Sequence, residues 1–229
     1  MITNNSLDER LSELQKAKVM EIFRQPAGVG AKALDMALSA FFFADHVVEL
    51  VERATPLPTP IACMEGCDSC CYSQVELSPP EALFLGRFVD QLFSEAEKEA
   101  LLERSRRSLD LQAGKTKVEI AKIRESLPCP LLRDHRCVAH QARPLVCRAM
   151  HALDAGACQK ALKTADLSSP PYYAHRQEIF SSISQGLLDG CRAVGCQSAP
   201  LELSLALLDY FAQPQPLERW LQGEAVFTL

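Results

Sequence analysis

Cys63-Met-Glu-Gly-Cys67-Asp-Ser-Cys70-Cys71 places four cysteines within nine residues of this 229-residue chain. Cysteines separated by two residues can turn their sulfurs towards one point, because the short loop between them lets backbone amides face the thiolates. One such pair is a weak signal for a metal site, but a second group of cysteines follows later in the chain. That group consists of Cys129, Cys137, Cys147 and Cys158. The sequence therefore predicts a metal centre that joins two distant segments, residues 63–71 and 129–158.

The cysteines leave the number of metal sites open. Eight thiols supply either two four-ligand sites or one site with spare redox-active thiols. The side chains of the neighbours Cys70 and Cys71 are expected to diverge, so that the two sulfurs do not serve one metal in the same way. Pro130 follows Cys129, and proline after a ligating cysteine is a feature of iron–sulfur loops, where it fixes the direction of the chain.

Basic side chains accompany the second group of cysteines. A metal held by four thiolates carries net negative charge in its usual state, and nearby guanidinium groups would offset that charge. Arg143 and Arg148 are the candidates for contact with the cofactor, because each lies within four residues of Cys147. The segment also contains Arg133, Arg136, His135, His140 and His151. Any of these histidines could replace a cysteine as a metal ligand.

The composition is that of a globular chain with a substantial core, at 48% hydrophobic and 23% charged residues. The formal net charge of −5 argues against nucleic acid as a partner. The polar, charged start of the chain predicts no signal peptide, and the apolar stretch Met36–Ala44 is too short to span a bilayer. We therefore expect a cytoplasmic protein without membrane contact, in which ten cysteines stay reduced.

Helical patterns dominate the rest of the chain. Ser78, Pro79 and Glu81 form the signature of a capping box at a helix start, and a further helix is expected from Ser94 towards Ser126. Apolar residues recur at helical spacing over residues 7–23, 31–54, 172–188, 201–211 and 217–221. The predicted fold is mainly α, a helical domain whose irregular cysteine-rich loops form the metal site.

Three parts are expected along the chain. Residues 1–60 form an N-terminal helical segment, and residues 61–160 form the cysteine-cluster metal-binding domain. A helical insertion at residues 79–126 separates the two cysteine segments of this domain. Residues 161–229 form a C-terminal helical segment that packs on the same domain.

The pattern of cysteines resembles the YkgJ-type cysteine-cluster family, described as zinc- or iron-chelating domains. Members read Cys-x2-Cys-x2-Cys-Cys, then Cys-Pro-Phe-Leu, then Cys-x-x-Tyr-x-x-Arg-Pro-x-x-Cys-Arg. This chain matches with Cys63, Cys67, Cys70 and Cys71, then Cys129-Pro130-Leu131-Leu132, then Cys137-Val-Ala-His140-Gln-Ala-Arg143-Pro144-Leu-Val-Cys147-Arg148. Cys158 fits the eighth family cysteine. The spacer after Cys63 is one residue longer than in the family, and His140 stands where an aromatic residue is usual.

The resemblance implies metal binding by these eight cysteines. It also ranks an iron–sulfur cluster, of the 4Fe–4S type, above zinc as the cofactor. Flagellin lysine N-methylases are distantly similar and carry a comparable cluster in proteins that transfer methyl groups. Only the cluster is carried over to this chain, because no residue here identifies a methyl-donor site.

Two other classes of function are open. One is a zinc-stabilised module without catalysis, in which the acidic helices bind a protein partner. The other is an iron–sulfur enzyme of methyl-transfer or radical-SAM type, since Cys63-x3-Cys67-x2-Cys70 has the radical-SAM spacing. Against the radical type, Ser69 replaces the usual aromatic residue, and no barrel of alternating strands and helices is indicated. Cys191 and Cys196 lie outside the matching region and are expected to be core thiols.

Overall fold

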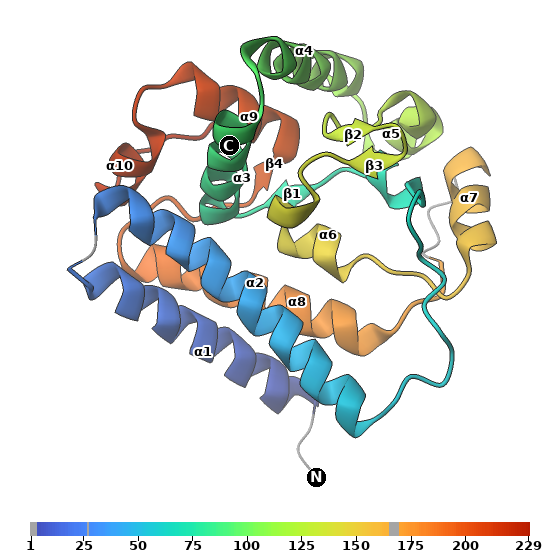
Figure 1. Cartoon of the computed structure of the whole chain (residues 1–229), viewed down its shortest axis with the longest axis horizontal. Coiled ribbons are helices and arrows are strands. Elements are labelled where there is room, and N and C mark those ends of the chain that lie inside the picture. The colour runs from blue at the N-terminus through green and yellow to red at the C-terminus, as the bar shows by residue number, and fades with distance from the viewer. Residues whose placement is uncertain (1–3, 27, 165–169) are drawn as a thin grey trace.

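The computed structural model describes residues 4–26, 28–164 and 170–229, and over these residues the protein is mainly helical, as predicted. Figure 1 shows a layer of long helices along one side, a second group of helices above it, and short elements on the remaining side. None of the described helices is long and apolar enough to cross a membrane.

The layer of long helices consists of α1 (Asn4–Arg24), α2 (Val29–Ala54) and α8 (Ala174–Ala193). α1 packs against α8 along its length, and both helices pack against α2. Gly186 makes the close approach of α1 and α8 possible, because a Cβ atom at this position would lie 2.2 Å from the carbonyl oxygen of Ser12. A side chain of any size at residue 186 would therefore push the two helices apart.

The second group of helices contains α3 (Pro79–Leu92), α4 (Glu95–Gln112), α9 (Leu203–Ala212) and α10 (Pro216–Leu221). α3 packs between α2 and α9, whereas α4 packs against α9 and α10 packs against α2. A short antiparallel pair, β1 (Glu76–Leu77) with β4 (Leu201–Glu202), joins the chain after the first cysteine segment to the C-terminal helices. The helices between the two cysteine segments are thus part of the main core.

The start signals at Ser78 and Ser94 are confirmed, since both residues form capping boxes. The length predicted for the second of these helices is wrong, because Gly114, with a φ of +70°, ends the regular helix. Thr116 then opens a new capping box for α5 (Lys117–Ile123), and the 3-10 turn η2 (Arg124–Ser126) follows. The expected single helix from Ser94 towards Ser126 is therefore three separate pieces.

One helix near the cysteines was not predicted. α7 (Ala155–Thr164) begins directly after Asp154, whose Oδ1 accepts hydrogen bonds from the amides of Gly156 at 2.8 Å and Ala157 at 3.1 Å. An aspartate in front of small residues is a known helix-start signal, and here it places Cys158 on a helix. The residues that follow, 165–169, lie outside the described part of the chain, so the predicted boundary at residue 160 stays a prediction.

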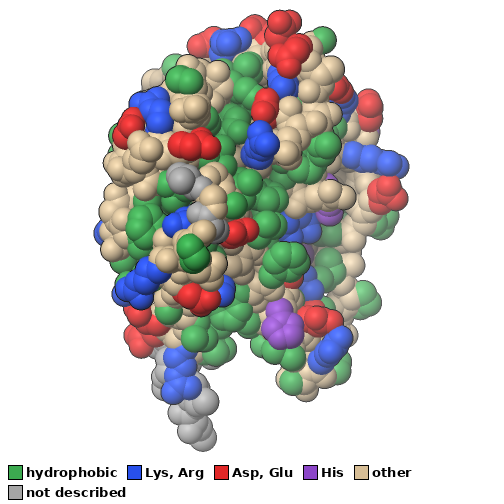
Figure 2. All heavy atoms as spheres, turned by 60° about the vertical axis from the view of Figure 1, so that its left-hand side comes forward, with side chains coloured by type: hydrophobic (Ala, Val, Ile, Leu, Met, Phe, Trp, Pro, Cys, Tyr) green, Lys and Arg blue, Asp and Glu red, His purple; other side chains and the backbone are tan. Residues whose placement is uncertain are grey.

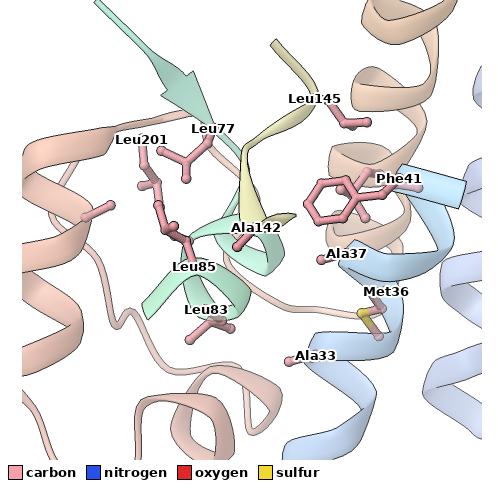
Figure 3. Close-up of a cluster of buried hydrophobic side chains, with 14 of the residues drawn as sticks. Ala33, Met36, Ala37, Phe41, Leu77, Leu83, Leu85, Ala142, Leu145 and Leu201 are labelled. Carbon is pink, nitrogen blue, oxygen red and sulfur yellow. The ribbon is translucent and has the colours of Figure 1, made fainter. Parts of the chain in front are cut away.

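A continuous hydrophobic core connects the two groups of helices and includes part of the second cysteine segment. Figure 3 shows Met36 and Phe41 of α2 on one side and Leu83 of α3 on the other, with Ala142 between the elements. Leu145 lies above Phe41 in the same view, and all five side chains are buried. The chain around Cys147 is therefore anchored in the core by its own apolar residues.

Charged side chains are interspersed on the face shown in Figure 2, with lysines and arginines next to aspartates and glutamates. That face shows no continuous stripe of lysines and arginines of the kind that would follow a nucleic-acid backbone.

Replacing Gly186 with alanine is expected to lower the free energy of unfolding by roughly 1–3 kcal/mol, because overpacking a close helix contact forces the backbones apart. Urea denaturation followed by circular dichroism measures the loss. Gln185→Ala, at the exposed neighbouring position of the same helix, is the matched control and should unfold near the wild-type midpoint. Equal midpoints for the two variants would contradict the close approach of α1 and α8.

Candidate metal centre

The first cysteine segment is an irregular loop with two consecutive turns. Gly66 has a φ of +85°, in the region that favours glycine, and the amide of Cys67 closes this turn with a 3.0 Å hydrogen bond. In the next turn the amide of Cys71 donates to the carbonyl oxygen of Asp68 at 2.7 Å. Asp68 directly precedes the 3-10 helix η1 (Ser69–Tyr72), which contains Cys70 and Cys71. Successive cysteines are therefore presented from tight turns rather than from an extended strand.

A β-hairpin positions Cys137 in the second segment. β2 (Leu132–Arg133) pairs with β3 (Arg136–Cys137), and the two residues between them, Asp134 and His135, have φ values of +49° and +60°. Positive φ at both central residues is the mark of the tight turn that matches the twist of a hairpin. This tight turn therefore positions Cys137 at the end of the hairpin.

Backbone hydrogen bonds join the two cysteine segments directly. The amide of Cys129 donates to the carbonyl oxygen of Cys71 at 2.7 Å, and the amide of Ala62 donates to that of Ala152 at 2.8 Å. Segments more than 50 residues apart in the sequence thus lie side by side at both ends of the cysteine region. The expected meeting of residues 63–71 with residues 129–158 is present in the fold.

Glu81 of α3 holds the second segment on the helical core. Its Oε2 accepts hydrogen bonds from the amide and the hydroxyl of Ser78, both at 2.7 Å, while Oε1 accepts one from the amide of Leu145, also at 2.7 Å. The side chain is buried, and burial raises the pKa of Glu81 although these donors oppose the shift. The sequence identified Glu81 as a cap but gave no sign of its bond to α6 (Leu145–Ala149), which carries Cys147.

Seven of the eight predicted ligands line one cavity of about 650 Å³. They are Cys63, Cys67, Cys70, Cys71, Cys129, Cys137 and Cys147. The eighth, Cys158, lies on α7, which packs against η1 on the same side of the molecule (Figure 1). Within the described ranges, no three histidine, cysteine or acidic side chains already converge as ligands of one ion. The thiols therefore share a space without being drawn onto a single point.

Cys158 has its sulfur neighbours in the first segment. Burial raises the pKa of Cys158, and the nearby sulfurs of Cys63, Cys67 and Cys70 raise it further. Burial likewise raises the pKa of Cys63, and Cys67 and Cys70 add to the shift. These four residues are thus electrostatic neighbours, although Cys158 is remote from the other three in the sequence.

The remaining cysteines have sulfur neighbours in both segments, and Cys70 of the first segment is a neighbour of Cys129, Cys137 and Cys147. Burial raises the pKa of Cys129 to about 12, and the sulfur of Cys137 adds to the shift. Burial also raises the pKa of Cys147, as do the sulfurs of Cys129, Cys70 and Cys137. Thiols in this part of the cavity therefore resist losing their protons unless a cation lies beside them.

The adjacent cysteines Cys70 and Cys71 are in contact with each other. A hydrogen bond from the Cys71 thiol lowers the pKa of Cys70 to about 7, and the same bond raises the pKa of Cys71. The expectation that these two side chains diverge is wrong, because the 3-10 turn η1 keeps both sulfurs on the cavity side. Cys71 also has Cys129 and Cys137 as neighbours, so the pair lies where the two sets of thiols meet.

Two arginines carry buried N–H groups without a hydrogen-bond partner. Arg143, a predicted cofactor contact, lines the cavity, and its Nε atom is one of these groups. Burial raises the pKa of Cys137, and the positive charge of Arg143 opposes this shift. Arg104 of α4 donates through Nε to the carbonyl oxygen of Pro130 at 2.9 Å, while its Nη2 is the second unpartnered group. Sequence reasoning missed Arg104, because only the fold brings α4 next to Cys129.

Arg148 has a different set of contacts from those predicted. Its Nε and Nη2 atoms donate to the carbonyl oxygens of Arg143 and Gln141 at 3.0 and 2.8 Å, and Nη1 pairs with Asp45 at 3.0 Å. The guanidinium group also lies 4.4 Å from the centre of the Phe41 ring. Arg148 does not line the cavity and instead fixes the loop before Cys147 on α2.

The histidines of the second segment differ in how available their ring nitrogens are as metal ligands. Nδ1 of His151 lies 2.8 Å from the carbonyl oxygen of Ala149, and Nε2 accepts a 2.7 Å hydrogen bond from the amide of Tyr173. Since an amide always donates, Nε2 is unprotonated and Nδ1 carries the proton, so both nitrogens are used. His135 and His140 line the cavity and keep the capacity to act as ligands.

Cys191 and Cys196 lie in the main core, away from the cavity. The amide of Cys196 donates to the carbonyl oxygen of Cys191 at 3.0 Å, and Gly195, with a φ of +78°, donates to that of Arg192 at 3.1 Å. This is the Schellman pattern that ends α8, in which the two outer residues make an apolar contact. Both cysteines fill those outer positions and are buried, at 0% and 6% exposure.

These features define a cysteine-rich chelating domain built into a helical protein. Residues 62–169 match the model of the CxxCxxCC family, described as “Putative zinc- or iron-chelating domain”. The match confirms the resemblance to a cysteine-cluster family for that segment and supports metal binding by it. No curated protein and no solved structure matches the chain, and the similarity to flagellin lysine N-methylases has no support among these comparisons.

Glu81→Gln is expected to lower the free energy of unfolding by about 1–3 kcal/mol, because a buried amide N–H₂ would face the donors of Ser78 or Leu145. Glu97→Gln is the matched control, since Glu97 caps α4 through Ser94 in the same way but at an exposed position. Urea denaturation should show a clearly larger loss for the buried position. A larger loss for Glu97→Gln would contradict the role assigned to Glu81.

Proposed function

We propose that this protein chelates metal through eight cysteines, with the metal clamping residues 63–71 to residues 129–158. The observation that carries the proposal is the single cavity, which collects seven of these thiols and the unpartnered N–H of Arg143. Thiolates are the ligands that zinc and iron–sulfur clusters have in common. A bound cation would also stabilise the deprotonated thiols that burial alone disfavours. The donor set therefore fits either kind of centre.

The eight thiols are proposed to form two groups of four. The outer group is defined as Cys63, Cys67, Cys70 and Cys158. The inner group is defined as Cys71, Cys129, Cys137 and Cys147. The division groups Cys158 with its neighbours Cys63, Cys67 and Cys70, and Cys71 with its neighbours Cys129 and Cys137. Cys70 is also a neighbour of Cys129, Cys137 and Cys147, and the proposal assigns the two members of the pair Cys70–Cys71 to different groups. A four-cysteine set is the usual complement for one structural zinc or for one iron–sulfur cluster.

An iron–sulfur cluster of the 4Fe–4S type is the occupant we favour over zinc. Cys129 is followed by proline, a feature of iron–sulfur loops. The buried N–H groups of Arg143 and Arg104 supply donors without acceptors, and hydrogen bonds to sulfur are one of the means by which proteins tune such clusters. When bound, such a cluster would supply one-electron chemistry, while the protein's own residues hold its ligands and offset its charge. A reducing, cytoplasmic location belongs to this proposal, because all ten cysteines are free thiols.

A catalytic role is the second candidate, and one observation favours it. A further cavity of about 440 Å³ adjoins the first, and the two share Cys129 in their linings. Glu202 lies in this second cavity, where burial raises its pKa, and its Oε2 accepts a 2.7 Å hydrogen bond from the amide of Leu205. A cavity beside the metal ligands is what group transfer at a cluster would need. The radical-SAM form has no counterpart of its barrel among the described residues, which form only two-residue strands.

Anaerobic purification with metal analysis and an absorption spectrum tests the proposal. A brown protein with about 4 irons and labile sulfide per cluster is the expected result, whereas a colourless protein with about one or two zincs would favour the zinc-stabilised interaction module. Cys67→Ser and Cys147→Ser should each lose about half of the metal, because each removes one ligand of one four-cysteine group. Cys196→Ala, outside the cavity, is the control and should keep wild-type content. Unchanged metal in both ligand variants would refute this ligand set.

Arg143→Gln is expected to weaken metal retention by about 10–100-fold in a chelator competition, the usual effect of removing a donor next to the ligands. Arg107→Gln, at an exposed position of α4, serves as the matched control and should behave as the wild-type protein. Thermal unfolding of the metal-free variants shows whether the fold is preserved. Wild-type retention by Arg143→Gln would remove Arg143 from the site.

A further inference from the structure

A cluster of titratable side chains lies outside the cysteine cavity, where the cysteine region meets the layer of long helices. Glu52 of α2 accepts hydrogen bonds from Arg176 of α8 at 2.6 and 2.7 Å, and its Oε1 lies 3.0 Å from Nε2 of His175. The ring of Tyr173 stacks on the ring of His151, with the ring centres 6.0 Å apart. None of these five residues lines the cavity, so metal binding alone does not account for the cluster.

His151 joins the connector before α8 to two segments of the cysteine region. Its Nε2 accepts the hydrogen bond from the amide of Tyr173, and its Nδ1 donates to the carbonyl oxygen of Ala149. Tyr173 in turn holds Thr59, because its hydroxyl donates to the carbonyl oxygen of Thr59 at 2.6 Å and accepts from the amide at 2.9 Å. The imidazole therefore fixes the residue that holds the segment leading to Cys63.

Two backbone hydrogen bonds lie at the same junction. The amide of Ala62 donates to the carbonyl oxygen of Ala152 at 2.8 Å, and the amide of Leu153 donates to that of Pro171 at 2.9 Å. These residues lead into the first cysteine loop and into α7, a helix in which no residue is buried. A segment with few buried contacts opens locally at low free energy. The position of α7 and of the first cysteine loop therefore depends on this junction.

His151 can make both of its hydrogen bonds only as a neutral imidazole. A proton on Nε2 would replace the acceptor with a donor and leave the amide of Tyr173 without a partner. The side chain is only 9% exposed, so a charged ring would also lose most of its contact with water. The closed junction and a protonated His151 are therefore incompatible.

The surroundings of His151 act in the same direction. Burial lowers the pKa of His151, and the charges of Arg176 and His175 lower it further, against the bond to Ala149 and the charge of Glu52. Its other titratable neighbours are the phenols of the connector, Tyr172 and Tyr173, while residues 59–62 have no titratable side chain.

We infer that His151, with its bonds to Ala149 and Tyr173, is a pH-sensitive latch that is closed while the imidazole is neutral and opens when the ring takes up a proton. Opening releases the segments that lead to Cys63 and to α7. Because the folded protein holds the imidazole neutral, the stabilisation is fully present above the ordinary histidine pKa of about 6.5 and is lost as the pH falls below it. The latch does not depend on which metal the cysteines bind.

Urea denaturation of the full-length protein between about pH 7.5 and about pH 5 tests the latch. Below about pH 6.5, the ratio of folded to unfolded wild-type protein should fall more steeply than that of His151→Gln, by up to about tenfold per pH unit, because the amide takes up no proton. His175→Gln is the matched control and should keep the wild-type pH dependence. Measurements on the protein as purified and after metal removal separate the latch from protonation of the thiols, which all three proteins share. Equal pH dependence in the wild type and His151→Gln, or its loss in His175→Gln instead, would overturn the inference.

NMR of the metal-free wild-type protein keeps the test independent of the variants. At neutral pH the imidazole of His151 should carry its proton on Nδ1. As His151 titrates, the protection of the Tyr173 amide against hydrogen exchange should fall at least about tenfold. The amide of Phe93, bonded to the carbonyl oxygen of Val89 at the end of α3, is the internal control and should stay protected. A proton on Nε2 at neutral pH, or protection of Tyr173 that does not follow the titration, would contradict the latch.

Discussion

The carboxylate of Glu81 lies at the start of α3, buried between two parts of the chain, and accepts hydrogen bonds from both. On one side it completes the first turn of α3, and on the other it holds the amide of Leu145, two residues before Cys147. Because the side chain is enclosed, neither part can exchange this bond for one to water without exposing the carboxylate or leaving a donor unpaired. The helical core therefore positions the cysteine region without the help of a metal.

Electrostatics then limits what the positioned thiols can do alone. Burial and mutual repulsion raise the pKa values of Cys129, Cys147 and Cys158, so most of these sulfurs keep their protons in the metal-free protein. Arg136 and Arg143 line the cavity, and two positive charges are too few to offset eight thiolates. A bound metal ion or cluster would provide the missing positive charge, and its binding would release the protons. Metal binding and final closure of the site are thus expected to be one coupled process.

Local signals in the sequence predicted much of the fold. Capping boxes at Ser78 and Ser94, and the apolar periodicity of α1, α2 and α8, depend on neighbouring residues and are visible without a structure. The link from Glu81 to Leu145 and the position of Arg104 beside Cys129 arise from contacts between remote segments, which no local pattern records. The same distinction explains the site. Spacing identified the candidate cysteines, but which thiols become neighbours was decided by the packing of α7 against η1.

The adjacency of Cys70 and Cys71 would let one cavity hold the two proposed groups of thiols. The bond from Cys129 to Cys71 fixes the second residue of the pair to the segment that packs on the core. Cys70, one residue earlier, remains exposed beside the looser turns of the first segment. Of these two neighbouring residues, Cys71 is half-buried and bonded through its backbone to Cys129, whereas Cys70 is exposed. Because the two sulfurs are also hydrogen-bonded to each other, a change of ligand at Cys70 alters the charge felt by Cys71. In the proposed arrangement, this contact would link the two groups of thiols directly.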